Sequence, residues 1–299
     1  QKRDYVCLAH SYHGETLGAL GVTDVPIFRT AYDSLLRAAH IVPSPDARLG
    51  DDATQHAIAG LRALLEQKSD QIAALIVEPL VQCAAGMGMY SPAYLQQARA
   101  LCNEFQVHLI ADEIAVGCGR TGTFFACEQA QIWGDFICLS KGISGGYLPL
   151  SLVMTNDQIY QAFYDDSVER AFLHSHSYTG NPLACRAALA CLDIFESDAV
   201  LLNNHERSAY LNQLLEPLAD FKRLKHRRQQ GTIGAFDIDV PDASQFARRY
   251  HEQALQRGLL LRPIGNTVYW MPPYVLDEPD MQTLASGIIE TLHATLKAA

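Results

Sequence analysis

Apolar residues in the first half of the chain come in short runs that are separated by longer amphipathic stretches. The short runs are rich in β-branched residues, which favours buried strands, whereas the longer stretches repeat their apolar residues at helical spacing. This alternation predicts an α/β fold with a mostly parallel central sheet flanked by helices. The expected strands are residues 6–9, 73–77, 107–111, 136–139 and 152–155, and the expected helices are residues 52–67 and 92–105, with Ser91 as N-cap and Pro92 at the first helical position.

The pattern changes after Asn181, where long helical stretches take over. A smaller unit of strands and helices then follows. We therefore expect a large domain over residues 1–200 and a small C-terminal α+β domain over residues 201–299. The expected elements of this second half are helices 182–197, 199–220, 243–257 and 278–296, and strands 233–240 and 268–271.

The composition is that of a globular protein, with 48% hydrophobic and 19% charged residues and a formal net charge of -10. No cluster of Lys and Arg interleaves with aromatic residues, so no nucleic-acid partner is expected. We interpret the basic run over residues 222–228 as a solvated face. No apolar run has the length of a membrane span and no segment has the order of a signal peptide, so we expect a cytoplasmic protein without a membrane partner.

Two further features concern the cysteines and the start of the chain. The 8 cysteines include no CxxC pair, so neither a disulfide nor a zinc site is expected. The chain begins at Gln1 without an initiator Met, and its first apolar run already has the pattern of a strand within a sheet. We therefore expect that an N-terminal part of a longer protein is missing.

Charged residues follow two of the predicted strands directly. Asp112 and Glu113 come after strand 107–111, and Lys141 comes after strand 136–139. In open α/β sheets, ligands bind beyond the carboxyl ends of the strands. A lysine and an aspartate there suit an aromatic nitrogen heterocycle, because the amine can bond to its aldehyde and the carboxylate can keep its ring nitrogen protonated. On residue types alone, a structural ion pair at the sheet edge is equally well supported.

The residues around these charges resemble a known family. The segment 110–122, which contains a Gly-Arg-Thr-Gly turn, and the segment 140–146 are similar to the class III aminotransferases of pyridoxal-phosphate fold type I. The resemblance extends over essentially the whole chain. It implies a homodimer with sites shared at the interface, pyridoxal 5'-phosphate bound through Lys141, and a ping-pong reaction through pyridoxamine phosphate.

Three other segments resemble a subgroup of that family. Residues 172–185, 260–265 and 269–274, together with Ala115, are similar to the adenosylmethionine-8-amino-7-oxononanoate aminotransferases of biotin synthesis. This resemblance implies amino transfer from S-adenosylmethionine to 8-amino-7-oxononanoate. The alternatives are another class III aminotransferase that uses lysine, ornithine, 4-aminobutyrate or a diamine, and a truncated chain that dimerises without catalysis.

The resemblance also implies roles for individual residues. Tyr12 would stack against the cofactor ring and help to place the substrate, and Glu78 would be an acid near that ring. Arg262 would bind the substrate carboxylate, for which the planar guanidinium is suited. Tyr269 would either face the substrate or pack in the core. At the cofactor phosphate, Ser177 would supply a hydroxyl group across the subunit interface, and Ser175 and His176 would line the same edge.

The chain departs from the family pattern at a few positions. The sequence Ser175-His176-Ser177 stands where relatives have Gly-Pro-Thr, and Val116 stands where they have Thr. Serine keeps the hydroxyl group of threonine, so a phosphate contact is preserved while the donor preference is in doubt. The family's Gly-Ser phosphate loop would lie upstream of Gln1.

Two rival sites can be considered. Residues 142–146 fit the G-x-S-x-G pattern of a hydrolase, but that pattern requires a helix directly after Ser144, and Pro149 with a strand-like run follows instead. His174 and His176 form an H-x-H pair that His10 and His13 could complete. No carboxylate or cysteine stands at ligand spacing beside them, so no metal site is predicted.

Overall fold

The central sheet of the computed structural model, which describes residues 2–297, has six strands in the order β2-β1-β3-β6-β7-β8. All neighbouring pairs are parallel except β7 and β8, which are antiparallel. The predicted mostly parallel sheet is therefore confirmed, and only the short strand β2 was missed. The strands are β1 (Asp4–Leu8), β2 (His40–Val42), β3 (Ile72–Val77), β6 (His108–Asp112), β7 (Phe136–Leu139) and β8 (Leu152–Thr155).

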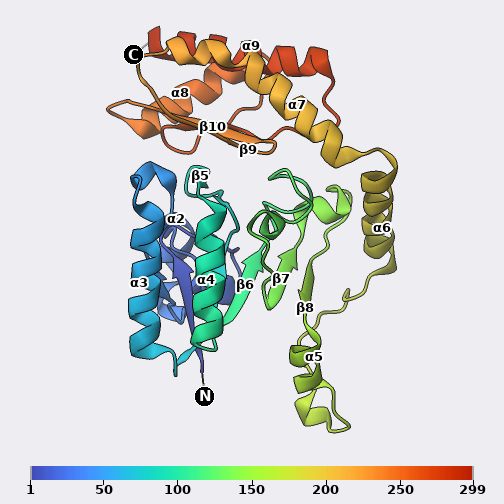
Figure 1. Ribbon diagram of the computed structural model, residues 1–299. Coiled ribbons are helices and arrows are strands. Elements are labelled where there is room, and N and C mark those ends of the chain that lie inside the picture. The colour runs from blue at the N-terminus through green and yellow to red at the C-terminus, as the bar shows by residue number, and fades with distance from the viewer. Residues whose placement is uncertain (1, 298–299) are drawn as a thin grey trace.

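Two long helices lie side by side against the sheet (Figure 1). They are α3 (Ala53–Lys68) and α4 (Pro92–Glu104). Helix α4 begins as predicted, because the Ser91 side chain accepts the N–H of Ala93 and Pro92 is the first helical residue. Between β1 and α3 the chain forms short helical turns, namely α1 (Leu17–Gly21), α2 (Pro26–Arg29), η1 (Thr30–Leu35) and η2 (Ala47–Leu49).

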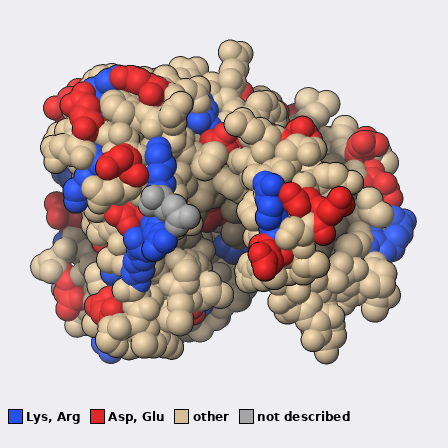
Figure 2. Space-filling view, turned by 90° about the horizontal axis from the view of Figure 1, so that it is seen from below, with Lys and Arg blue, Asp and Glu red and all other residues tan. Residues whose placement is uncertain are grey.

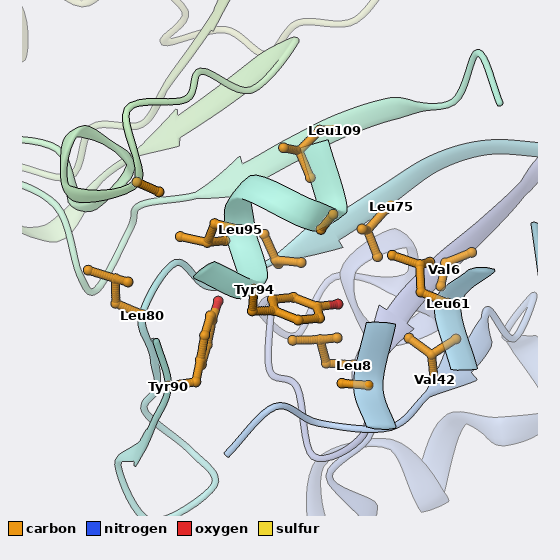
Figure 3. Packing of buried hydrophobic residues seen from close by; sticks show 14 of the residues in the cluster. Val6, Leu8, Val42, Leu61, Leu75, Leu80, Tyr90, Tyr94, Leu95 and Leu109 are labelled. Carbon is orange, nitrogen blue, oxygen red and sulfur yellow. The ribbon is translucent and has the colours of Figure 1, made fainter. Parts of the chain in front are cut away.

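The main apolar core lies between the sheet and these two helices. Tyr94 of α4 is fully buried at its centre, and the ring of Tyr90 meets the Tyr94 ring edge-on at 5.5 Å. Figure 3 shows Tyr94 among leucine and valine side chains that come from both the strands and the helices. This burial of strand residues against α3 and α4 holds the carboxyl ends of the strands in place. The fully buried members around Tyr94 include Val6, Leu8, Leu61, Leu75, Leu95 and Leu109.

A second layer lies above the sheet (Figure 1). Its antiparallel sheet has the order β11-β10-β9 and is covered by helices on the side that faces away from the central sheet. The layer has its own apolar core, but Ile233 and Ala235 of β10 pack in the main core. The division into two domains at residue 200 stays a prediction. The elements are β9 (Leu224–Gln230), β10 (Ile233–Ile238), β11 (Thr267–Trp270), α7 (Val200–Leu214), α8 (Ala243–Leu255) and α9 (Glu278–Lys297).

Two expectations about this layer hold only in part. The predicted helix 199–220 ends at Leu214 and gives way to a short 3-10 turn, η6 (Glu216–Asp220), because Pro217 has no N–H to continue the helix. The basic run 222–228 is a solvated face only in part, because it lies largely in strand β9 and exposes Lys222, Arg223 and Lys225 but not Arg228. The side chain of Arg228 is only 10% exposed and pairs with Asp237 at 2.9 Å.

A long segment projects from the β8 edge of the sheet (Figure 1). It contains β8, the helix α5 (Asp157–Phe163), the turn η5 (Val168–Arg170) and the loop that leads to α6 (Pro182–Ser197). Seen from below in Figure 2, the right-hand part of the molecule carries acidic and basic side chains together, beside an area without charged side chains. The most exposed apolar residues of the projecting segment are Val153, Tyr164, Val168, Phe172, Leu173 and Tyr178. So much apolar surface is typical of an interface. Within residues 2–297, no helix combines the length and apolar character that a membrane crossing requires.

Candidate active site

Asp112 and Lys141 lie at the same edge of the central sheet. Their strands β6 and β7 are parallel neighbours, and Asp112 pairs in register with Cys138, three positions before Lys141. Asp112 is the last residue of β6 and is buried, whereas Lys141 begins the 3-10 turn η4 (Lys141–Ser144) and is exposed. The Lys141 amine makes no hydrogen bond or ion pair within residues 2–297. The two groups thus flank one rim.

The charges of Lys141 and Asp112 both act on a half-buried cysteine. Cys83 belongs to the turn between β4 (Val81–Gln82) and β5 (Gly88–Met89). Burial raises the pKa of the Cys83 thiol well above its usual range, the charges of Glu78 and Asp112 raise it further, and the charge of Lys141 lowers it. The turn therefore forms a wall of the same rim, next to the predicted cofactor groups.

The carboxylate of Asp112 is held by the loop that follows β1. Nδ1 of His13 lies 2.7 Å from Oδ2 of Asp112, and Oδ1 accepts the N–H of Ile114 at 3.1 Å. An ionised carboxylate only accepts hydrogen bonds, so Nδ1 carries the hydrogen. The other ring nitrogen, Nε2, is buried and has no partner within the described part of the chain. His13 was considered only as a metal ligand from the sequence, so this contact was missed.

Glu78 completes this polar cluster from the end of β3. Its Oε1 accepts the N–H of Cys83 at 3.0 Å, and its Oε2 accepts the N–H of Tyr12 at 3.1 Å. Burial raises the pKa of Glu78 to about 7, and Asp112 contributes to the rise, whereas His13 and the two peptide N–H groups oppose it. Glu78, Asp112 and the loop around Tyr12 are therefore brought together as the sequence predicts.

The Tyr12 side chain contacts its own loop. Its hydroxyl group donates to Glu15 at 3.0 Å, and its ring lies 4.8 Å from the ring of Phe28 at an angle of 52°. Burial raises the pKa of the Tyr12 hydroxyl, and the Glu15 carboxylate adds to this effect. Because the peptide N–H of Tyr12 binds Glu78, the backbone of Tyr12 lies at the rim. Its stacking on a cofactor stays a prediction.

Glu113 turns away from the rim although it adjoins Asp112. Its carboxylate accepts the N–H groups of Ala126 at 2.7 Å and Cys127 at 2.9 Å, at the start of the 3-10 turn η3 (Ala126–Ala130). Burial raises the pKa of Glu113, and these two N–H groups oppose the rise. Peptide donors thus satisfy this buried acid, and no cation is needed beside it.

The model of the Aminotransferase class-III family matches residues 1–292. The chain belongs to this family. Class III aminotransferases depend on pyridoxal phosphate, so the predicted enzyme class and cofactor are confirmed together with the fold. The donor set fits this cofactor, because Lys141 offers an amine that is unpaired among residues 2–297 and Asp112 offers a buried carboxylate oriented by His13.

Individual relatives in the class III family agree with the resemblance. The chain is 44% identical to the adenosylmethionine-8-amino-7-oxononanoate aminotransferase of Helicobacter pylori, over 98% of this chain and 67% of that protein. It is 39% identical to the protein of the same name from Synechococcus elongatus, over 94% of this chain and 67% of the relative. The chain thus spans about two thirds of these relatives.

Solved structures of the class show the same fold. The adenosylmethionine-8-amino-7-oxononanoate aminotransferase of Methanocaldococcus jannaschii is 29% identical with a TM-score of 0.89, over 98% of this chain and 68% of that chain. A pyridoxal-phosphate-bound amine transaminase from an uncultivated Pseudomonas species is also 29% identical, with a TM-score of 0.91, over 98% of this chain and 70% of that chain.

The Gly-Arg-Thr-Gly turn typical of the family connects the two layers. The guanidinium group of Arg120 donates to the carbonyl of Pro272 and lies 4.3 Å above the ring of Tyr274. The Tyr274 hydroxyl donates in turn to the carbonyl of Cys118 at 2.7 Å. The turn therefore fixes the upper layer against the segment that joins Asp112 to Lys141.

The remaining predicted site residues are not joined to the rim within one chain. Arg262 is exposed and makes no hydrogen bond or ion pair among residues 2–297. Tyr269 packs against the main core. The loop Ser175-His176-Ser177 is exposed in the projecting segment, and within the described residues no hydrogen bond links it to Asp112 or Lys141. Their roles stay predictions.

The rival sites differ from what their chemistry requires. The Ser144 hydroxyl donates to the carbonyl of Leu148 at 2.6 Å, and turn residues rather than a helix follow it. A nucleophilic serine needs a free hydroxyl beside a base. Across residues 2–297, no group of three or more His, Cys, Asp or Glu side chains is arranged to hold a metal ion.

Proposed function

We propose that this class III aminotransferase transfers the amino group of S-adenosylmethionine to 8-amino-7-oxononanoate and so forms 7,8-diaminononanoate. The observation that carries the proposal is the 44% identity, over 98% of the chain, to a relative named for this reaction. The rim of Asp112, Lys141 and Glu78 supports it, because it supplies the amine and the carboxylate that the family's cofactor needs. A cytoplasmic protein of biotin synthesis is consistent with eight free thiols.

Each residue of the rim would have its own role in amino transfer. When bound, pyridoxal phosphate supplies an electron sink for the bonds of the substrate carbon that carries the amino group. Lys141 would hold the cofactor and then, as a free amine, move the proton at that carbon. Asp112 would keep a proton on the ring nitrogen, and His13 would hold the Asp112 carboxylate in position. Tyr12 would place the substrate from the loop after β1.

Residues outside the rim would bind the ends of the ligands. Arg262 would pair with the carboxylate of the oxononanoate, since its exposed guanidinium has no other partner among the described residues. Ser177 would donate its hydroxyl to the cofactor phosphate, with Ser175 and His176 beside it. These three residues lie in the projecting apolar segment, so they would serve the site of the second copy in a homodimer.

A second candidate is an aminotransferase of the same class with another amino donor. The similarity to an amine transaminase, with a TM-score of 0.91, supports this candidate. The Ser175-His176-Ser177 sequence also departs from the Gly-Pro-Thr of the family pattern, which puts the donor preference in doubt.

The donor can be identified with the complete protein loaded with pyridoxal phosphate. Formation of 7,8-diaminononanoate would be followed with S-adenosylmethionine, lysine, ornithine or 4-aminobutyrate as donor. We expect product with S-adenosylmethionine alone, and turnover with another donor only would favour the second candidate. In parallel, Lys141→Ala should abolish the visible absorbance band of the bound cofactor, whereas Lys68→Ala should keep it. A band that persists in Lys141→Ala would refute the lysine assignment.

A further inference from the structure

Two arginines bind three consecutive carbonyl groups of the turn between β4 and β5. Arg48 of η2 donates to the carbonyl of Ala85 at 2.6 Å. Arg228 of β9 donates to the carbonyls of Gly86 at 2.5 Å and Met87 at 2.8 Å. One arginine comes from the large layer and the other from the upper layer, so the turn is held from both sides.

Asp237 of β10 joins the two arginines. Its Oδ1 lies 2.9 Å from Nη2 of Arg228, and its Oδ2 lies 3.4 Å from Nη1 of Arg48. The hydroxyl group of Thr267 donates to the same carboxylate at 2.7 Å. Asp237 is only 10% exposed at its side chain, so both guanidinium groups would lose a buried counter-ion without it. Asp46 pairs with Arg48 at 2.6 Å.

The turn has a conformation that outside contacts must maintain. Gly86 has a φ of +67°, and a Cβ atom there would lie 2.7 Å from Oγ1 of Thr267. The next residue, Met87, also has a left-handed φ of 53° although it is not glycine. Such backbone is costly and persists only where its surroundings impose it. The Arg48 and Arg228 hydrogen bonds supply that restraint.

The other end of the turn reaches the rim. Met87 donates its N–H to the carbonyl of Cys83 at 3.1 Å, and Cys83 donates its N–H to Glu78 at 3.0 Å. The thiol of Cys83 lies within reach of the charges of Lys141 and Asp112. A shift of the carbonyls that the arginines hold would therefore move both the Cys83 peptide and the carboxylate of Glu78.

We propose that Asp237 is a positioning residue of the active site, which acts through Arg48 and Arg228 on the turn that holds Glu78 at the rim. Through these contacts, a change in the position of the upper layer would change the position of the Glu78 carboxylate and so the electrostatic potential around Lys141. It rests on the proposed roles of Lys141 and Asp112. The groups that face Glu78 are His13 from the loop after β1, Asp112 from β6, and Cys83 and Tyr90 from the β4–β5 hairpin.

The test compares Asp237→Asn with Glu78→Gln in the complete protein loaded with pyridoxal phosphate. Two quantities are measured, namely kcat/KM and the pH midpoint of the change in the visible absorbance band. Glu78 is ionised only above about pH 7. In that range Glu78→Gln removes a negative charge from the rim, which disfavours the protonated form and should move the midpoint to lower pH. Asp237→Asn should move it in the same direction and lower kcat/KM by about 10- to 100-fold. The double variant should be no worse than Glu78→Gln alone.

A matched control separates positioning from general stability. Glu104→Gln breaks another arginine pair, with Arg62, whose side chains are half exposed and lie on α3 and α4. It should leave both quantities unchanged. If Asp237→Asn lowers only the melting temperature, or if its effect adds in full to that of Glu78→Gln, the proposal is wrong.

A second variant keeps the test decisive if Asp237→Asn does not fold. Arg228→Lys retains the charge but cannot reach both Gly86 and Met87, so the same shift of the midpoint is expected, and an unshifted midpoint overturns the proposal. Failure of the site itself would be recognised separately, because Lys141→Ala would then retain the visible band.

Discussion

Nδ1 of His13 lies 2.7 Å from Oδ2 of Asp112, and the side chains are only 2% and 7% exposed. A hydrogen bond to a buried carboxylate fixes its orientation. In the proposed site, Asp112 would keep a proton on the ring nitrogen of the cofactor. His13 would then act on the cofactor through Asp112 rather than by touching the reacting atoms.

His13→Ala should therefore slow catalysis without preventing cofactor attachment. A hydrogen bond to a charged group is worth about 1.5–3 kcal/mol, so kcat should fall by about 10- to 100-fold. The visible absorbance band should remain, since Lys141 is intact. His108→Ala is the matched control, because His108 begins the strand that Asp112 ends and its side chain is 53% exposed. Equal rates for the two variants would contradict the role of His13.

The raised pKa of Glu78 predicts a pH-dependent stability. Burial raises this pKa from 4.5 to about 7, so the folded protein holds a proton that the unfolded chain releases at lower pH. The stabilisation from that proton is complete below pH 4.5 and is lost as the pH rises through about 7. The side chain introduced by Glu78→Gln cannot ionise. The free energy of unfolding of this variant, relative to that of the parent protein, should therefore be higher at pH 8 than at pH 5 by roughly 2 kcal/mol.

Urea unfolding of the apoprotein at the two pH values measures this change. Glu66→Gln is the control, since the Glu66 side chain is 57% exposed on α3 and its replacement should leave the difference between the two pH values unaltered. A difference that stays constant for Glu78→Gln as well would mean that Glu78 ionises normally in the folded protein.

The rim could be predicted from the sequence because two apolar runs with the pattern of a strand are each followed closely by a charged residue, Asp112 in one case and Lys141 in the other. A buried strand that ends in a charge reveals its carboxyl end, and parallel neighbours place such ends together. The contact between His13 and Asp112 could not be predicted in the same way, because 99 positions separate the two residues and no local pattern links them. The same limit applies to the pair of Arg228 and Asp237. Arg228 belongs to a run of basic residues, and nothing in that run singles out Arg228 as the buried one.

The direction of strand β8 could not be predicted from the sequence pattern either. The run 152–155 is as apolar as its neighbours, so nothing in it shows that β8 is antiparallel to β7. By contrast, the end of helix α7 at Leu214 could have been predicted, because Pro217 is a helix-breaking residue. The helical spacing of the apolar residues around Pro217 favoured a longer helix instead.

The projecting segment predicts that the protein dimerises through its apolar loop. Leu173 is 78% exposed there, and an aspartate in an apolar interface would be desolvated without a partner. Leu173→Asp should weaken the dimer by at least about tenfold, as measured by size-exclusion chromatography with light scattering. Val275→Asp is the control and should leave the dimer intact, because Val275 is 86% exposed and lies between β11 and α9, outside the projecting segment. A Leu173→Asp protein that remains dimeric would place the interface elsewhere.

Subunit complementation tests whether Ser177 serves the partner's site. Lys141→Ala and Ser177→Ala should each be impaired as homodimers. A mixed dimer, however, contains one site that combines the intact lysine of one subunit with the intact serine of the other. Activity should therefore reappear on mixing, to about half that of the parent dimer per mixed dimer. No recovery in a mixed dimer would show that Ser177 acts within its own chain, and a fully active Ser177→Ala homodimer would show that it has no role.

The close approach of two backbone segments at Gly231 predicts a large cost for a single methyl group. A Cβ atom at this position would lie 2.4 Å from the carbonyl carbon of Thr121 and 2.5 Å from the carbonyl oxygen of Arg120, in the turn that connects the two layers. Gly231 also has a φ of +56°, so alanine there would carry backbone strain as well.

Gly258→Ala separates the two contributions. Gly258 has a φ of +75° with no atom near its Cβ position, so this variant should lose only about 1 kcal/mol from strain. Gly231→Ala should lose about 1–3 kcal/mol more, because backbone atoms cannot move aside as a flexible side chain can. Both values follow from urea unfolding. Equal losses would mean that the two layers separate freely at this turn, and Arg120 would then not fix the upper layer against the rim.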